Sequence, residues 1–253
     1  MIQALIFDVD GTLADTERDG HRVAFNQAFA EAGLDWQWSV ELYGELLAVT
    51  GGKERMRFYL DRYRPEWPRP ADLTALIAQL HKRKTYFYTE LLATGQIPLR
   101  PGVKNLLLEA RSRGIPLAIA TTTTPENVTA LLTHSLDPES PSWFTVIAAG
   151  DIVGAKKPAP DIYHYTLQRT TWDQRYCVAF EDSYNGLVAA KGAGLPTVIT
   201  INDYTRDQDF RQADLVLDQL GSPQQPCRVL GGTASLPSFS YVTVELLEHL
   251  LPH

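Results

Sequence analysis

The chain has 253 residues, of which 44% are apolar and 21% charged, a balance that is typical of globular proteins and excludes collagen, coiled coils and disordered chains. With 30 acidic and 23 basic residues the formal net charge is −7, so we expect no nucleic-acid partner, because duplex nucleic acid requires a basic surface. The two cysteines, Cys177 and Cys227, are too few for a disulfide framework.

The N-terminal residues do not have the pattern of a signal peptide. Residues 1–7 lack a basic segment and are followed at once by Asp8 and Asp10. No apolar run approaches the roughly 18 residues that cross a bilayer. We therefore expect no membrane association and a cytoplasmic protein, or a protein of the plastid stroma if a targeting segment has been removed.

Short and uniformly apolar runs recur along the chain and predict strands that are covered on both faces. Segments with helical punctuation lie between them, and two of these end at Gly114 and Gly194. Alternating strands and helices of this kind predict an α/β fold with a parallel sheet. The predicted strands are 4–7, 117–120, 146–149, 177–180, 197–201 and 214–217, and the predicted helices are 103–113, 185–193 and 242–251.

Residues 16–96 have a different character and predict an all-helical insertion. They contain an apolar stripe at helical spacing, which includes Phe25 and Phe29, and a high density of aromatic residues that we expect to form a core rather than sugar platforms. The predicted domains are therefore a core of residues 1–15 plus 97–253 and a helical domain of residues 16–96. Because the insertion begins just after the first strand, we expect it to overhang the carboxyl edge of the sheet, where ligands bind.

The first chemically informative cluster is Asp8-Val9-Asp10-Gly11-Thr12, directly after the first strand. Two carboxylates in such a setting are tolerable when a divalent cation or a proton lies between them. Aspartate is also a covalent nucleophile in phosphoryl chemistry. The alternatives are an ordinary turn with a capping aspartate, or a calcium loop, although position 19 holds Asp where such a loop requires Glu.

Three further clusters follow later strands. Thr121 to Thr124 can form an anion cradle or simply cap a helix. Lys157 precedes a proline, which favours an extended backbone that could aim its ammonium into a site, although solvated lysines are more common. Glu181 and Asp182 can complete a Mg²⁺ site or cap a helix. All four clusters could converge on one edge of the sheet.

Taken together, the four motifs resemble those of the haloacid dehalogenase-like superfamily of phosphatases and phosphomutases. They are D-x-D-G-T, a strand that ends in Thr, Lys-Pro, and E-D-S-x-x-G. The resemblance implies a Rossmann-like core with an inserted helical cap. It also implies that Asp8 forms an aspartyl-phosphate, that Asp10 is the general acid and base, and that Thr121 and Lys157 bind the transferring phosphoryl group. Mg²⁺ would be held by Asp8, the carbonyl of Asp10 and Asp182, with Glu181 nearby or acting through water.

Residues 15–22, 50–55, 81–84, 156–163 and 217–221 are similar to the CbbY-type sugar phosphatases of Calvin-cycle organisms. That resemblance implies hydrolysis of xylulose 1,5-bisphosphate to xylulose 5-phosphate. The basic residues of the helical domain, Lys53, Arg55, Lys82, Arg83 and Lys84, could grip a second phosphate, although some are expected to be solvated. The residues expected to bind substrate are Glu17, Thr50, Gly51, Gly52, Lys53, Arg55, Lys84, Thr122 and Thr123.

Two alternatives remain. The β-phosphoglucomutases share the core motifs but place a histidine four residues after the equivalent of Thr16, where this chain has Gly20 and then His21. A catalytically silent binding protein would be expected to have lost motif residues, and this chain retains them. We expect a monomer whose partner is a small sugar phosphate.

Overall fold

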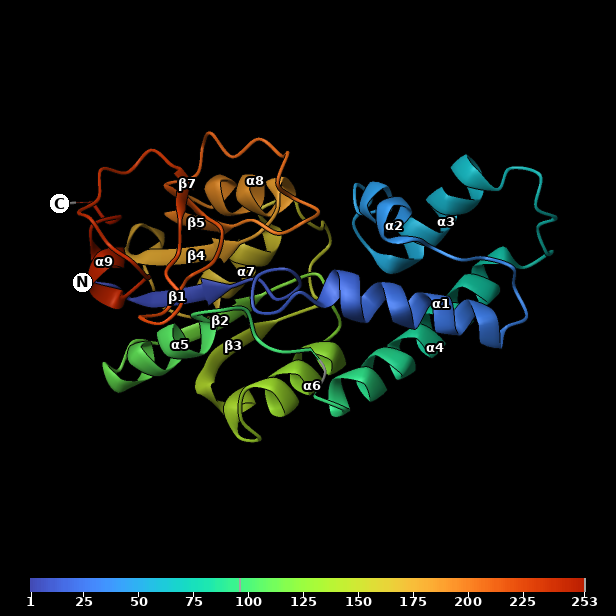
Figure 1. The fold of residues 1–253 in the computed structure, drawn as a ribbon, viewed down its shortest axis with the longest axis horizontal. Helices are drawn as coiled ribbons and strands as arrows, with labels where there is room; N and C mark the ends of the chain where they lie inside the picture. Colours follow the sequence, from blue (N-terminus) through green and yellow to red (C-terminus); the bar gives the residue numbers. More distant parts are fainter. Residues whose placement is uncertain (96, 253) are drawn as a thin grey trace. The chain divides into compact units, whose positions relative to one another are not determined.

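The computed structural model of the protein describes residues 1–95 and 97–252, which form two compact units (Figure 1). One unit comprises Met1–Asp15 and Pro98–His253, and the other comprises Thr16–Ile97. We call them the sheet unit and the helical unit and describe each by itself.

The sheet unit is built on seven strands in the order β3-β2-β1-β4-β5-β6-β7. Strands β1 to β6 pair in parallel, which confirms the predicted parallel sheet, whereas β7 pairs antiparallel with β6. The sequence does not predict β7, because its residues are exposed and form no buried apolar run. The strands are β1 (Ala4–Phe7), β2 (Leu117–Ala120), β3 (Phe144–Ala148), β4 (Cys177–Glu181), β5 (Thr197–Thr200), β6 (Leu215–Leu217) and β7 (Val229–Gly231).

Burial of a strand follows its place in the sheet. All residues of β1, β2, β4, β5 and β6 are buried, as expected for strands covered on both faces. The edge strand β3 begins at Phe144 rather than at Val146, and its residues Thr145 to Ile147 are exposed or half-buried. The prediction of full burial is wrong for this strand, because an edge strand is screened by a neighbour on one side only.

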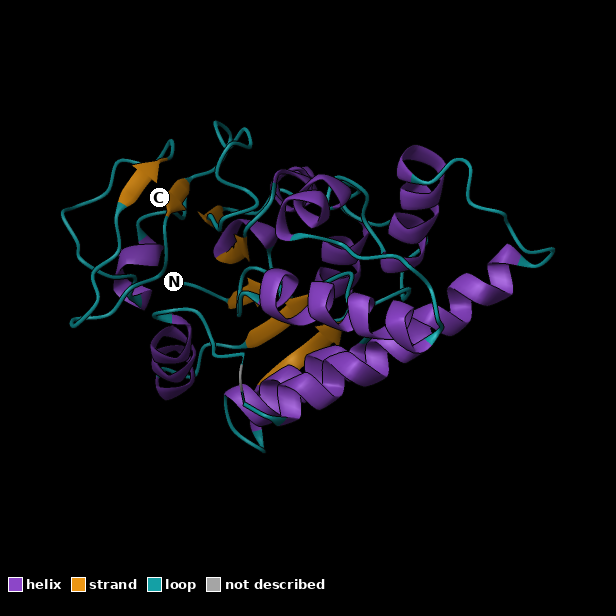
Figure 2. Ribbon diagram, turned by 45° about the vertical axis from the view of Figure 1, so that its right-hand side comes forward, coloured by secondary structure: helices purple, strands orange, loops and turns teal. Residues whose placement is uncertain are grey.

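Helices cover both faces of the sheet (Figure 1 and Figure 2). The chain passes through α5 and α6 as it steps from β1 to β2 and β3, and through α7 and α8 as it steps back to β4 and on to β5. Because such crossovers are right-handed, opposite directions of travel place the two helix pairs on opposite faces. The elements are α5 (Val103–Ser112), α6 (Pro125–Ser135), η2 (Ser140–Trp143), α7 (Asp161–Gln168), η3 (Gln174–Tyr176), α8 (Tyr184–Gly192) and α9 (Val244–Glu248).

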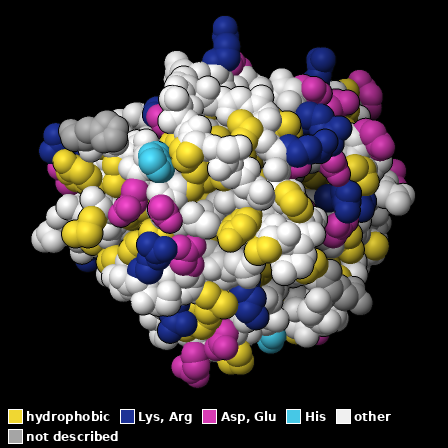
Figure 3. Space-filling model, turned by 60° about the vertical axis from the view of Figure 1, so that its left-hand side comes forward, with side chains coloured by type: hydrophobic (Ala, Val, Ile, Leu, Met, Phe, Trp, Pro, Cys, Tyr) yellow, Lys and Arg dark blue, Asp and Glu magenta, His cyan; other side chains and the backbone are white. Residues whose placement is uncertain are grey.

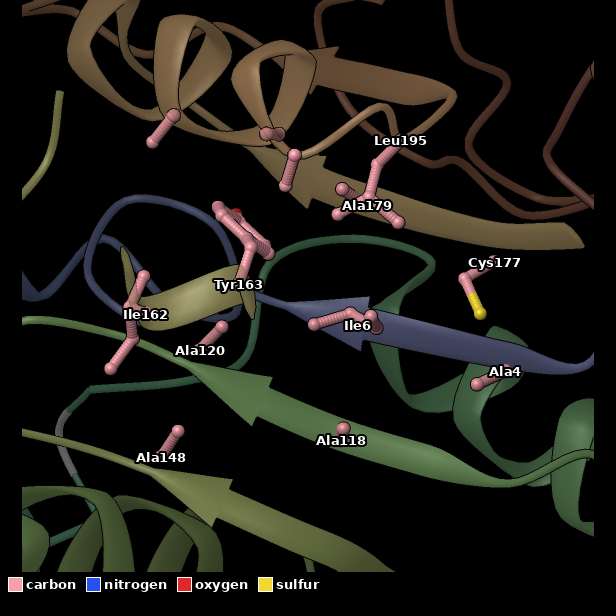
Figure 4. Close-up of a cluster of buried hydrophobic side chains, with 13 residues drawn as sticks. Ala4, Ile6, Ala118, Ala120, Ala148, Ile162, Tyr163, Cys177, Ala179 and Leu195 are labelled. Atoms are coloured by element: carbon pink, nitrogen blue, oxygen red, sulfur yellow. The ribbon is translucent and has the colours of Figure 1, made fainter. Parts of the chain in front are cut away.

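Small side chains line the face of the sheet beneath α7 and α8 (Figure 4). Ala118 and Ala120 of β2, Ala148 of β3 and Ala179 of β4 are all fully buried there. Alanines let α7 approach the sheet closely, so the buried ring of Tyr163 on α7 lies over this layer. This packing brings a phenol to the end of β4.

An aromatic core holds the helical unit together. The ring of Trp38 contacts the rings of Phe25 and Phe29, with centroids 4.7 and 4.9 Å apart, and also those of Tyr43 and Tyr59. All five side chains are buried, so the prediction that the aromatic residues form a core is confirmed for them. The elements are η1 (Glu17–His21), α1 (Arg22–Glu31), α2 (Val40–Leu46), α3 (Gly52–Tyr63) and α4 (Leu73–Ala93).

Side chains of opposite charge are interspersed on the molecular face drawn in Figure 3. Exposed arginines pair with carboxylates close to them in sequence, such as Arg175 with Asp173 and Arg211 with Asp209. Among the helices described, none combines the length and the apolar character needed to cross a membrane.

Candidate functional site

The predicted functional residues of the sheet unit gather at the carboxyl ends of three adjacent strands. Asp8 follows β1, Thr121 follows β2, and Asp182 follows β4, whose last residue is Glu181. β1 lies between β2 and β4, and the three strands run parallel, so these residues share one edge of the sheet. This is also where the strand order switches direction, the place at which open α/β sheets bind ligands.

Lys157 connects the three strand ends. Its ammonium nitrogen Nζ lies 2.7 Å from Oδ1 of Asp8 and 2.5 Å from Oε1 of Glu181. It also donates a hydrogen bond to the carbonyl of Ala120 at the end of β2, over 2.9 Å. Lys157 is buried, whereas the neighbouring Lys156 is half-buried. The alternative of a solvated surface lysine is therefore wrong for Lys157.

Asp8, Glu181 and Asp182 form a buried carboxylate cluster, in which one oxygen of each residue lies within 4.8 Å of the others. Lys157 supplies one positive charge to three carboxylates, so the cluster carries an excess of two negative charges when all three are ionised. Oε2 of Glu181 is buried and has no hydrogen-bond partner among the described residues. Since Mg²⁺ takes oxygen ligands and buried polar atoms require partners, these residues fit such an ion.

Burial governs the ionisation of this cluster. It raises the pKa of Asp8 to about 7, against the opposing effect of Lys157. Burial, together with the charges of Asp8 and Glu181, raises the pKa of Asp182 well above its ordinary value. For Lys157, burial alone would lower the pKa, but the two neighbouring carboxylates raise it above its usual value. A cation bound among these groups would lower the pKa of both aspartates, because it stabilises their charged forms.

The turn after β1 places Asp10 next to the cluster. Asp10 is half-buried, and its charge adds to the negative charges that act on Asp8. Position 11 requires glycine, because its φ is +81° and a Cβ there would lie 2.2 Å from Oδ2 of Asp182. The hydroxyl of Thr12 lies 3.4 Å from Oδ2 of Asp8. Through Gly11, the Asp-x-Asp-Gly-Thr segment therefore packs directly against Asp182, the acid that follows β4.

The threonine cluster is divided between the strand end and helix α6. Thr121 is buried, and its Oγ1 accepts a hydrogen bond from the backbone N–H of Thr123 over 3.4 Å. Oγ1 of Thr123 in turn accepts from Nδ2 of Asn127, and Thr122 is half-buried between the two. Thr124 caps α6 by accepting from the N–H of Asn127. The helix-capping alternative is thus correct for Thr124.

The same alternative is wrong for Glu181 and Asp182. Helix α8 is capped by Ser183, whose side chain accepts from the N–H of Gly186 over 3.2 Å. A Cβ at Gly186 would lie 1.8 Å from Oε2 of Glu181. The glycine of the E-D-S-x-x-G motif therefore leaves space for the Glu181 carboxylate.

Three residues at this site are missing from the sequence-based prediction. The hydroxyl of Tyr163 donates to Oε1 of Glu181 over 2.5 Å, and Nδ2 of Asn202 donates to Oδ2 of Asp182 over 2.7 Å. Arg100 is buried and binds backbone carbonyls. Tyr163 belongs to the Lys-Pro motif that the sequence singles out, whereas Arg100 and Asn202 lie in turns, where polar residues are common.

In the helical unit, the structure brings Arg55 and Glu17 together. Nη1 of Arg55 lies 3.7 Å from Oε2 of Glu17 and donates to the hydroxyl of Tyr43 over 2.7 Å. That hydroxyl donates to Oε2 of Glu17, and Nε of Arg55 lies 3.4 Å from the carbonyl of Val49. Because Arg55 is only 7% exposed, these partners hold its guanidinium in a defined orientation.

Lys84 is a second buried cation of the helical unit. Its Nζ lies 2.7 Å from Nδ1 of His21, a residue to which the sequence assigns no role. It also lies 5.1 Å from the ring centroids of Phe25 and Tyr88, and aromatic faces attract ammonium groups. The rings of Phe25 and Tyr88 thus stabilise the ammonium group of Lys84 on α4.

The basic residues of α4 do not form one cluster. Lys84 is buried, but Lys82 is exposed and Arg83 pairs with Glu31 over 2.5 Å. The expectation that some basic residues of the helical domain are solvated therefore holds for Lys82, because consecutive residues of a helix point in directions about 100° apart.

The remaining predicted residues lie around the start of α3. Thr50, Gly51 and Gly52 are half-buried, and Lys53 is exposed in the first turn of the helix. Gly51 has a φ of +98°, and a Cβ on Gly52 would lie 2.8 Å from Cδ2 of His81. The backbone conformation at Gly51 therefore favours glycine, whereas at Gly52 the ring of His81 leaves little space for a side chain.

Comparison with known proteins gives consistent matches. The family model of the haloacid dehalogenase-like hydrolases matches residues 2–194. The chain is 48% identical to the plasmid-encoded CbbY of Cupriavidus necator, over 89% of this chain and 88% of the relative. The structure of CbbY from Rhodobacter sphaeroides in complex with phosphate is similar at a TM-score of 0.79 and 48% identity, covering 87% of this chain and 95% of that one. A mutant of that protein in complex with xylulose 1,5-bisphosphate gives a TM-score of 0.80 at 47% identity, covering 88% and 98%.

Proposed function

The chain belongs to the haloacid dehalogenase-like hydrolases, and from that membership we propose that it is a Mg²⁺-dependent phosphatase that converts xylulose 1,5-bisphosphate to xylulose 5-phosphate. The observation that carries the proposal is the contact of Lys157 with Asp8 and Glu181 at the shared strand ends. It supports phosphoryl transfer, because that reaction depends on positioning and on the neutralisation of charge. The substrate is proposed from the structural relative that holds xylulose 1,5-bisphosphate.

In the proposed first step, a carboxylate oxygen of Asp8 attacks phosphorus and the P–O bond to the sugar C1 oxygen breaks, which leaves an aspartyl-phosphate. Asp10 donates its proton to the departing sugar oxygen. In the second step Asp10 takes a proton from water, the water oxygen attacks phosphorus, and the P–O bond to Asp8 breaks to release inorganic phosphate. The half-buried position of Asp10 next to Asp8 suits both proton transfers.

Lys157 and Thr121 are proposed to bind the transferring phosphoryl group, since Thr121 is buried at the end of β2 and the buried Lys157 donates to Asp8. Asp8, Asp182 and the carbonyl of Asp10 would hold Mg²⁺, with Glu181 as a close or water-mediated partner. When bound, the ion would neutralise charge on the phosphoryl oxygens. Lys157 would also keep Oδ1 of Asp8 in a fixed position, because the two atoms are 2.7 Å apart.

The helical unit is the specificity domain in this proposal. Arg55 and Lys84 supply positive charge for the phosphate that stays on the sugar, and Glu17 supplies an acceptor for sugar hydroxyls. Arg55 is suited to this task because Tyr43 and Glu17 already orient its guanidinium. The residues proposed to bind substrate are Glu17, Thr50, Gly51, Gly52, Lys53, Arg55 and Lys84 of the helical unit, and Thr122 and Thr123 of the sheet unit.

A phosphate-release assay with Mg²⁺ over pentulose and hexose mono- and bisphosphates tests the proposal. We expect xylulose 1,5-bisphosphate to have the highest kcat/KM, at least about tenfold above the monophosphates. A hydrogen bond to a charged group contributes about 1.5 to 3 kcal/mol, and a factor of ten corresponds to about 1.4 kcal/mol. One phosphate should be released per sugar, and a chelator should abolish the reaction. If no sugar phosphate is hydrolysed, the phosphatase assignment is wrong and a catalytically silent binding protein is favoured.

A hexose phosphomutase is the second candidate and is less supported than the phosphatase; the observation on its side is the local geometry of η1. η1 is a π-helix, in which the N–H of Arg22 bonds the carbonyl of Glu17 five residues earlier. Such a turn takes up one residue more than an α-helical turn. The extra residue therefore moves His21 toward the place that residue 20 would take in a regular α-helix. Position 20 is where the phosphomutases have their histidine.

The test for the second candidate uses β-glucose 1-phosphate with a bisphosphate primer. The phosphatase proposal expects release of inorganic phosphate and little glucose 6-phosphate. Formation of glucose 6-phosphate faster than phosphate release would replace the phosphatase by a mutase.

The proposal takes a single chain as the working unit and a sugar phosphate as its small-molecule partner, in the cytoplasm or the plastid stroma. One chain contains both the carboxylate cluster and the buried cations of the helical unit. Light scattering of the active protein should give the mass of one chain, and a larger active species would contradict this part of the proposal.

A further inference from the structure

Arg100 is a buried arginine for which the proposed chemistry has no role. One terminal nitrogen, Nη1, donates to the carbonyls of Gly11 and Thr200, the latter over 2.9 Å. The other, Nη2, donates to the carbonyl of Ile201 over 2.5 Å and to that of Asp218 over 3.0 Å. Four carbonyls from three parts of the chain therefore converge on one guanidinium that is 8% exposed. The planar fork of five N–H donors suits this arrangement.

Two of these carbonyls belong to segments that contact Asp182. Gly11 packs so tightly against Asp182 that a Cβ at position 11 would lie 2.2 Å from its Oδ2. Ile201 directly precedes Asn202, whose Nδ2 donates to the same Oδ2 over 2.7 Å. Burial and the neighbouring acids raise the pKa of Asp182, and the charge of Arg100 acts in the opposite direction. Arg100 therefore bridges the two supports of this carboxylate.

Arg100 also lies where the chain re-enters the sheet unit. Its backbone N–H donates to the carbonyl of Leu13 over 2.8 Å, and Ala14 forms an antiparallel bridge with Leu99. Its Nε lies 3.4 Å from Oδ1 of Asp15, the last residue of the outgoing segment. The outgoing and incoming segments are thus bound to each other and to Gly11 through one residue.

We propose that Arg100 is a positioning residue for the phosphoryl-transfer site, which holds the Asp182 carboxylate at the place where it can bind a cation together with Asp8. The inference rests on the proposed Mg²⁺-dependent function. Groups that orient metal ligands without touching the metal typically change metal affinity or activity by about 10- to 100-fold when they are removed. Lysine cannot replace the planar fork, because its ammonium is a compact point charge with three donors.

The test compares Arg100→Lys and Arg100→Gln with Arg113→Lys, a control at a surface arginine that pairs with Glu109. Binding of Mg²⁺ alone is measured by calorimetry and by the shift of Tm with Mg²⁺, and kcat and KM are measured at saturating Mg²⁺. For Arg100→Lys we expect the dissociation constant of Mg²⁺ to rise about tenfold or more and kcat to fall to a similar extent, with KM within about twofold. Arg113→Lys should behave as the unmodified protein. If Arg100→Lys does not fold, as judged by circular dichroism, Arg100→Gln carries the same test without a misplaced buried charge.

A folded Arg100 variant that binds Mg²⁺ and turns over substrate as the unmodified protein does, with only a lower Tm, would show a structural role and overturn the inference. A higher KM for the substrate together with an unchanged dissociation constant of Mg²⁺ would overturn it as well. The proposed function fails differently, since the unmodified protein would then release no phosphate, whereas its Mg²⁺ binding could still be measured.

Discussion

The sheet unit and the helical unit differ in the charged groups that they bury together. At the strand ends, Lys157 contacts two of the three carboxylates of a buried cluster, which has an excess of negative charge when all three are ionised. In the helical unit, Arg55 contacts the hydroxyl of Tyr43 and the carboxylate of Glu17, and Lys84 contacts a ring nitrogen of His21. The proposed cation site and the proposed anion site therefore differ in their local charge, and the net charge of −7 describes neither of them.

The largest effect is expected from Asp8→Asn, which removes the proposed nucleophile at the centre of the negative cluster. An amide cannot form the aspartyl-phosphate, so kcat should fall by at least about 10⁴-fold. The variant should remain folded, because the amide keeps the shape of the side chain and removes a charge that burial disfavours. Phosphate release and Tm are measured on the same preparation.

The exposed Asp207→Asn is the matched control, since it changes the net charge equally. It should retain full activity. Ready turnover by Asp8→Asn would end the assignment of Asp8 as the nucleophile.

Arg55→Ala tests whether the buried cations of the helical unit bind the phosphate that stays on the sugar. Loss of a guanidinium that binds the remote phosphate should lower kcat/KM for the bisphosphate by about 10- to 100-fold, or about 1.4 to 2.8 kcal/mol. Turnover of a small artificial ester such as p-nitrophenyl phosphate should change by less than about threefold, because that ester has no second phosphate. The two rates are compared at the same Mg²⁺ concentration.

Arg57→Ala on the same helix serves as the control, because Arg57 is exposed and bonds the hydroxyl of Thr74. It should leave both rates unchanged. Equal losses on both substrates in Arg55→Ala would contradict a role in binding the remote phosphate.

Much of the sheet can be predicted from the sequence, because buried parallel strands are uniformly apolar. β1 and β2 have the predicted bounds, and β4 and β5 differ from the prediction by one residue. The prediction is weaker at the two edges of the sheet, at β3 and β7, where exposure breaks the apolar pattern. Local patterns reveal burial, and they do not reveal which strand lies at an edge.

The site shows the same limit at the level of single residues. Asp8 and Asp182 stand in motifs at strand ends, so the sequence indicates them. Arg100 stands in a turn and binds carbonyls about 100 positions away, such as that of Thr200. Because every residue has a backbone carbonyl, neither residue type nor spacing predicts which carbonyls Arg100 binds. Asn202 is equally inconspicuous, since its contact with Asp182 exists only because β4 and β5 are neighbours.

A smaller effect is expected from Tyr163→Phe, which perturbs the negative cluster without changing its charge. The variant deletes the hydroxyl that donates to Oε1 of Glu181 over 2.5 Å. A hydrogen bond to a charged group contributes about 1.5 to 3 kcal/mol, and Lys157 remains to hold the same oxygen, so kcat should fall by about 3- to 10-fold. Tyr165→Phe on the same helix is the control and should be silent. A Tyr163→Phe variant with unchanged kcat and Mg²⁺ affinity would show that Lys157 alone orients Glu181.

The smallest effect concerns the pH dependence of stability. Burial raises the pKa of Asp8 to about 7 and that of Asp182 well above its ordinary value, compared with about 3.9 in an unfolded chain. The cation-free folded protein therefore binds more protons than the unfolded chain between about pH 4 and pH 7. The stability of that form falls as the pH rises through this range.

Mg²⁺ binds the ionised carboxylates in competition with protons, so its stabilising effect should grow over the same range. After treatment with a chelator, the increase in Tm on addition of Mg²⁺ should be larger at pH 8 than at pH 5.5, by roughly 5 °C, which corresponds to about 2 kcal/mol for a protein of this size. Asp182→Asn should lose most of this increase, and Asp207→Asn should keep it. An increase of the same size at both pH values would show that the cation does not bind at the buried carboxylates of the sheet unit. The sheet unit would then not contain the cation site that distinguishes it from the helical unit in this proposal.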